Sequence, residues 1–213
     1  MPTSEEILAG LTQIANDWTW LAIGWHVYLA VLVGILLVGR QLSRRLVGGL
    51  LALPLLSVSA MAWTVGNPFN GTVFAAVGVA LLVIAVRMAP ERAQVSPPWL
   101  LVLGSGLFLF GWVYPHFLET GSGWTYLYAA PTGLVPCPTL TAVIGISLML
   151  GGLGSRAWMG TLGAVGLVYG VIGALRLGVL IDGVLILGAL IILGTTVMVD
   201  VATRRPAHTA STR

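Results

Sequence analysis

The chain has 213 residues, of which 57% are hydrophobic and 8% are charged, and its formal net charge is +3. Soluble domains carry about 25% charged residues, so this composition excludes an ordinary soluble domain and predicts an integral membrane protein. The basic residues are all arginine and lie between apolar runs, whereas a nucleic-acid-binding face needs a continuous basic patch. We therefore expect the lipid bilayer to surround the chain, and we expect no nucleic-acid partner.

The first segment has the pattern of a short amphipathic helix. Thr3 and Glu6 have the spacing of a capping box, in which each side chain accepts a hydrogen bond from the other residue's backbone N–H. Apolar residues then recur at helical intervals on one face: Ile7, Leu8, Leu11 and Ile14. We expect a helix over residues 3–15 that lies along the membrane surface. Because the segment lacks a basic start and a small-residue cleavage site, we expect it to be retained.

Seven apolar runs along the chain could cross a bilayer as helices. A helix needs about 20 residues to do so. The seven runs are Trp18 to Gly39, Leu46 to Val65, Thr72 to Val86, Trp99 to Val113, Pro138 to Leu153, Trp158 to Leu175 and Ile181 to Val199. The predicted fold class is therefore an all-α integral membrane protein. We expect one seven-span domain over residues 1–203 and a disordered tail over residues 204–213.

The arginines test this count, because cytoplasmic loops near the ends of spans collect positive charge. With seven spans, nine of the ten arginines fall on one side: Arg40, Arg44, Arg45, Arg87, Arg92, Arg156, Arg204, Arg205 and Arg213. Only Arg176 falls on the other side. This distribution predicts an amino terminus outside the cell and a carboxyl terminus in the cytoplasm.

Residues 114–137 form the longest polar stretch between two predicted spans, and they end at the only cysteine, Cys137. Pro136 and Pro138 flank this residue and Thr139 follows, a motif that we call the knuckle. Proline favours the first turn of a helix, so we expect the next helix to begin at about Pro138. A thiol at a helix amino terminus is favoured as the thiolate, the form that attacks or binds metal. The alternative is a small buried apolar residue in a helix-initiating turn.

Other residues in or near this outer loop are candidate ligands. His116 and Glu119 stand three apart, and together with Cys137 they could hold a transition metal; the alternative is ordinary solvation in an outer loop. His26 lies inside the first predicted span, where ionisable residues are rare, and its alternative is a hydrogen bond to a neighbouring helix. The candidate ligand-binding set is Cys137, His26, His116, Glu119, Tyr114 and Tyr128, with Cys137 and His116 as the metal candidates.

Two further patterns favour structural roles. Asp182 begins the last predicted span, and helix capping with an ion pair to Arg176 explains both residues. Gly166 and Gly170 have the GxxxG spacing of a helix-packing face. Such a face would suit a neighbouring helix, a membrane partner or a homo-oligomer.

The knuckle and its surroundings resemble a family of small bacterial integral membrane proteins with a Pro-Cys-Pro-Thr hallmark. The shared features are an amphipathic lead, a basic first loop, and these motifs: Asn67-Pro68, Tyr114-Pro115, Ala130-Pro131-Thr132-Gly133 and Pro136-Cys137-Pro138-Thr139. The chain departs from the family at Thr132 and Leu140, where the family has an aromatic residue and a threonine. The resemblance implies a multi-pass protein of the bacterial cytoplasmic membrane and supplies no activity.

The sequence favours binding or transport of a metal ion or small solute at an outward-facing pocket near Cys137, since proline-started helices often line such sites. No catalytic residue is assigned, and the only cofactor it suggests is a transition metal. One alternative is a thiol- or metal-dependent oxidoreductase, in which Cys137 is the nucleophile or ligand. The other is an accessory subunit that packs through its glycine faces.

Overall fold

The computed structural model describes residues 3–40 and 42–204, with side chains as far as Thr196. Within this part the chain folds into helices joined by loops and contains no β-strand. The α-helices are α1 (Ser4–Asp17), α2 (Thr19–Leu37), α3 (Arg44–Thr64), α4 (Pro68–Arg87), α5 (Pro98–Val113), α6 (Tyr126–Ala129), α7 (Pro136–Met149), α8 (Arg156–Val171) and α9 (Gly183–Arg204). Short helical turns lie at Gly123–Thr125, Gly151–Gly154, Ile172–Arg176 and Leu180–Asp182. The predicted tail lies outside the described residues except for Arg204.

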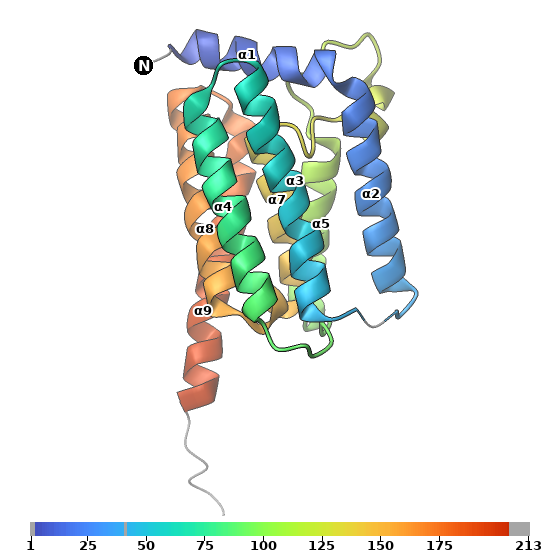
Figure 1. Cartoon of the computed structure of the whole chain (residues 1–213), viewed down its shortest axis with the longest axis vertical. Coiled ribbons are helices and arrows are strands. Elements are labelled where there is room, and N and C mark those ends of the chain that lie inside the picture. Colours follow the sequence, from blue (N-terminus) through green and yellow to red (C-terminus); the bar gives the residue numbers. More distant parts are fainter. Residues whose placement is uncertain (1–2, 41, 205–213) are drawn as a thin grey trace, which may run out of the picture.

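Helix α1 lies across one end of a bundle formed by the long helices (Figure 1). Its capping box is confirmed, since Thr3 Oγ1 accepts from the backbone N–H of Glu6 and Glu6 Oε2 accepts from that of Thr3. The predicted apolar face is buried at Leu11 and Ile14. At its carboxyl end, the Asn16 side chain donates to Phe117 O and accepts from the backbone N–H of Glu119. These bonds fix α1 against the loop that follows α5.

Helix α7 is the centre of the bundle, and every residue from Pro136 to Leu148 is buried. The helix begins at Pro136 rather than at the predicted Pro138, and Val135 is its N-cap. A buried helix amino terminus normally leaves N–H groups without partners, but proline has no N–H. Thr139 Oγ1 completes the turn, because it donates to Val135 O at 2.7 Å and accepts from Gly133 N at 2.8 Å.

Helices α5 and α7 touch backbone to backbone through glycine. A Cβ added at Gly104 would lie 2.6 Å from Gly145 O, and one at Gly111 would lie 2.6 Å from Ala142 N. A Cβ on Gly145 would lie 2.4 Å from Phe108 N. All three distances are shorter than real carbon contacts, so these positions require glycine. The sequence analysis did not identify this interface.

Glycines on α8 pack against α9, as the predicted packing face requires. A Cβ on Gly163 would lie 2.5 Å from the Leu193 side chain, and one on Gly170 would lie 2.7 Å from that of Ile186. A Cβ on Gly166 would lie 2.8 Å from the side chain of Ile144 in the central helix. The GxxxG pattern is therefore used inside the molecule.

Four segments of the described chain are helices long and apolar enough to cross a membrane: Thr19–Leu37, Arg44–Thr64, Pro68–Arg87 and Arg156–Arg176. They support a membrane-embedded protein. Three shorter apolar helices accompany them: Pro98–Val113, Pro136–Met149 and Leu180–Thr196. All seven predicted segments are thus helical, whereas the count of seven crossings and the orientation of the termini stay predictions.

Alanine at Gly104 tests the close approach of α5 and α7. We expect Gly104→Ala to lower the melting temperature in detergent. Overpacking costs about 1–3 kcal/mol, and this cost outweighs the gain of about 1 kcal/mol that alanine has over glycine in a helix. Gly106→Ala is the matched control, since nothing lies within 4 Å of a Cβ at Gly106. We expect that variant to melt at the wild-type temperature or above it. Equal melting of the two variants would contradict the glycine interface.

Candidate functional site

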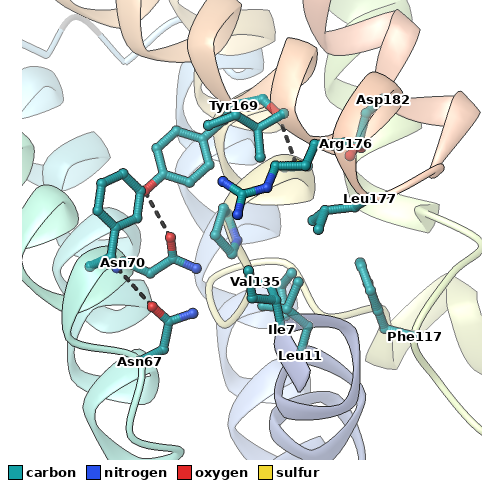
Figure 2. A pocket seen from close by; sticks show the side chains of 15 residues that line it. Ile7, Leu11, Asn67, Asn70, Phe117, Val135, Tyr169, Arg176, Leu177 and Asp182 are labelled. Carbon is teal, nitrogen blue, oxygen red and sulfur yellow. Dashed lines mark hydrogen bonds between the residues drawn. The ribbon is translucent and has the colours of Figure 1, made fainter. Parts of the chain in front are cut away.

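A cavity of about 180 Å³ lies beneath α1, at the amino terminus of the central helix α7 (Figure 2). Its walls come from α1, α4, α7, α8 and the turns that follow α8. They are mostly apolar, with a few polar side chains, and consist of Ile7, Leu11, Asn67, Phe69, Asn70, Phe117, Val135, Pro136, Cys137, Tyr169, Ile172, Gly173, Arg176, Leu177 and Asp182. Small-molecule sites in proteins have this composition.

A second cavity of about 230 Å³ adjoins the first beneath the same helix. Ile7, Leu11, Asn67, Asn70 and Pro136 line both cavities. One turn of α1 and the first residue of α7 therefore contribute to the walls of both cavities. Helix α1 acts as a cover for both.

A chain of hydrogen bonds orders the polar wall formed by α4 and α8. Asn67 caps α4, where its Oδ1 accepts from the backbone N–H of Asn70 at 3.0 Å. The Tyr169 hydroxyl donates to Asn70 Oδ1, also at 3.0 Å. Both amide oxygens are therefore occupied, and Figure 2 shows both amide nitrogens directed toward the cavity.

Asp182 occupies the opposite wall and is 2% exposed. Its Oδ1 accepts from the Tyr114 hydroxyl at 2.5 Å. A Cβ on Gly173 would lie 1.8 Å from Asp182 Oδ2, so glycine makes room for this carboxyl. The predicted ion pair with Arg176 is wrong, because within the described chain no ion pair joins the two. Asp182 instead turns inward to Tyr114.

Tyr114 is fully buried in the loop after α5, and its ring stacks on Phe117 with centroids 6.1 Å apart. Two effects raise the pKa of the Tyr114 phenol well above its usual range: burial, which is the larger, and the negative charge of Asp182. The hydroxyl therefore remains a donor at neutral pH. Phe117 has a φ of 70°, a left-handed conformation that costs a bulky residue about 1–2 kcal/mol. Its ring forms part of the cavity wall.

Cys137 lines the first cavity from the first turn of α7 and is 8% exposed. Its Sγ lies 4.0 Å from Tyr169 O, the limit of a thiol hydrogen bond. The carboxyl of Asp182 lines the same cavity. Of the predicted candidates, Cys137 lies on the wall, and Tyr114 lies behind Asp182.

The remaining candidates, His26, His116, Glu119 and Tyr128, do not line this cavity. His116 is half-buried, with its ring against Phe117, and it does not line the cavity. Glu119 is exposed in the loop after α5, and Tyr128 is exposed on α6. Among the described residues there is no group of three or more His, Cys, Asp or Glu side chains that could hold a metal ion.

His26 belongs to the contact between α2 and α5. Its Nε2 lies 2.9 Å from Trp112 O in the last turn of α5, and its Nδ1 lies 2.8 Å from Ala22 O of its own helix. A neutral imidazole has one N–H, so it donates to one of these carbonyls at a time. The alternative reading of a histidine bonded to a neighbouring helix is confirmed.

Two wall residues, Asn70 and Tyr169, were not singled out from the sequence, and two others, Asp182 and Arg176, were given structural roles only. The available signals were Asn70 just before one predicted span and Tyr169 inside another, since buried polar side chains need partners. Asn67 was interpreted only as part of a turn. No spacing in the sequence relates α4 to α8.

Comparison of the chain with protein-family models, curated proteins and solved structures finds no match. The resemblance carried by Pro136 to Thr139 therefore stays a prediction. The function is inferred from the geometry of the site.

Removing the Tyr114 hydroxyl tests the buried pair. We expect Tyr114→Phe to lower the free energy of unfolding by about 1–3 kcal/mol, because Asp182 would lose its donor in a buried site. Tyr128→Phe is the control, since Tyr128 is 52% exposed, and we expect no change. Thermal unfolding in detergent measures both, and an unaltered Tyr114→Phe protein would show that the pair contributes nothing.

His26→Leu should also destabilise the protein, by about 1–2 kcal/mol, because Trp112 O would be left without a donor in an apolar contact. His26→Gln retains an N–H donor, and we expect it to recover part of the loss. We expect the wild type to have the highest melting temperature, His26→Gln an intermediate one and His26→Leu the lowest. A leucine variant as stable as the wild type would contradict a stabilising bond between α2 and α5.

Proposed function

We propose that the chain is a seven-span membrane protein, with its amino terminus outside, that binds a small, largely apolar solute in the cavity beneath α1. The observation that carries the proposal is the cavity itself, which lies at the amino terminus of the buried helix α7 under an amphipathic cover. A cavity of about 150 Å³ is known to hold benzene. The first cavity, at about 180 Å³, is thus suited to a ligand of similar width.

The grouping of basic loops supports the orientation. The loops before α3, after α4 and before α8 meet at the end of the bundle away from α1 (Figure 1). Arg44 forms an ion pair with Glu91 at 3.1 Å, and a Cβ on Gly154 would lie 2.7 Å from the Arg44 guanidinium. Arg176 lies at the α1 end, where its carbonyl oxygen accepts from Ser4 Oγ at 3.2 Å. Positive charge gathered at one end favours that end as cytoplasmic.

The walls favour a solute over a metal ion. Transition metals need several nitrogen, sulfur or carboxylate donors, and Cys137 and Asp182 are the cavity's two such side chains. Apolar side chains make up most of the remaining wall. Burial of a hydrocarbon ligand there gains about 25 cal/mol per Å² of apolar surface.

The single thiol makes occupancy measurable. We expect 1-octanol to slow the reaction of Cys137 with N-ethylmaleimide several-fold in zwitterionic lipid nanodiscs, because both small molecules need the same space. Ile7→Trp should fill the cavity, slow the reaction without octanol and remove the effect of octanol. Labelling is followed by mass spectrometry of the intact protein.

Two variants complete this test. Ala9→Trp places the same bulk on the exposed face of α1, and we expect it to react like the wild type, with protection by octanol. Cys137→Ser sets the background. No protection in the wild type, or stoichiometric bound metal that is lost in Cys137→Ser, would overturn the solute proposal.

A further inference from the structure

The polar wall of the cavity presents hydrogen-bond donors. Asn67 Oδ1 accepts a hydrogen bond from the backbone N–H of Asn70. The amide nitrogen of Asn67 is itself a donor and cannot take the place of this oxygen, so it must face away from α4. The Asn70 oxygen is occupied by the Tyr169 hydroxyl. The two NH₂ groups extend toward the same space from one face of α4 (Figure 2).

Arg176 adds a positive charge to these donors. Figure 2 shows its guanidinium reaching into the cavity from the turn after α8, on the side that faces the two asparagines. No carboxylate in the described chain forms an ion pair with it. The other charged wall residue, Asp182, accepts a hydrogen bond from Tyr114. A guanidinium and two amides together match an anionic group, and the guanidinium fork suits a planar carboxylate.

The rest of the space is apolar. Ile7, Leu11, Val135 and Leu177 cover it, and the first two continue into the second cavity. Helix α1 is amphipathic, and such helices lie at the boundary between head groups and chains of a bilayer. Amphiphiles of one chain concentrate at the same depth.

We propose that the ligand is a single-chain carboxylate of medium length, with its head group on Arg176, Asn67 and Asn70 and its chain beneath α1. This inference rests on the proposed function and names the ligand class. The two adjoining cavities have room for one short chain and are too small to bury a two-chain phospholipid completely.

Matched probes of one chain length test the head group. Protection of Cys137 from N-ethylmaleimide is measured with octanoate, 1-octanol and octylamine at neutral pH in zwitterionic nanodiscs. We expect octanoate to protect at a concentration about tenfold below that of octanol, which corresponds to about 1.4 kcal/mol. Octylamine should be the weakest of the three.

Two variants assign the preference to the donors. Arg176→Gln should bring octanoate to the level of octanol and leave octanol unchanged. Asn67→Asp keeps an oxygen to cap α4 and replaces a donor by an acceptor, so it should weaken octanoate alone. Arg87→Gln is the control: it makes the same change in net charge at an exposed position at the carboxyl end of α4, and should behave as the wild type.

The outcomes separate the two proposals. Equal protection by octanoate and octanol, unaffected by Arg176→Gln, would overturn the carboxylate ligand and leave the solute site standing. Stronger protection by octylamine than by octanoate would overturn it in favour of a cation at Asp182. Octyl phosphate is a fourth probe of the same chain length, and stronger protection by it than by octanoate would replace the carboxylate by a phosphate. No protection by any probe would overturn both proposals.

Discussion

The structure depends on burying the whole of α7, including its amino terminus. A helix end in an apolar interior carries N–H groups that water cannot reach, and each unpaired group costs free energy. The knuckle reduces this cost, since Pro136 and Pro138 have no N–H and Thr139 bonds on both sides of the turn. This gives the Pro-Cys-Pro-Thr motif a structural reason that requires no chemistry at sulfur. The cysteine then faces a cavity because of where the helix has to begin.

Packing around α7 determines where space remains. Glycine brings α5 against α7 with no gap, and glycines of α8 do the same for α9. At the end of α8 the chain passes into the π turn Ile172–Arg176, and single π turns are frequent at functional sites. There Gly173 leaves room for the Asp182 carboxyl, and Arg176 turns back over the cavity. The first cavity therefore lies at the end of the bundle that α1 covers.

Two opposite walls give this space its chemical character. The wall from α4 and α8 presents donors, because the asparagine oxygens are used within the protein. The other wall holds a carboxyl that is bonded to Tyr114. A carboxyl group that is already hydrogen-bonded repels an anion less than a free one does. The cavity therefore presents hydrogen-bond donors on one wall and a paired carboxyl group on the other. Helix α1 covers it through a small number of bonds, at Ser4 and Asn16.

The sequence by itself determined the class of protein, the helical segments, the capping box of α1 and a helix beginning at the knuckle, because hydropathy, capping and proline act within a few residues. It also identified Cys137 and Tyr114 as parts of one region. Only the tertiary structure decided that Asn70, Tyr169 and Asp182 meet there, while His26 and Glu119 do not. Those contacts join segments 68 to 99 residues apart, and helix periodicity specifies the face on which a residue lies without specifying the helix that it meets. The glycine interface between α5 and α7 was missed for the same reason, since glycine has no side chain whose partner the sequence could suggest.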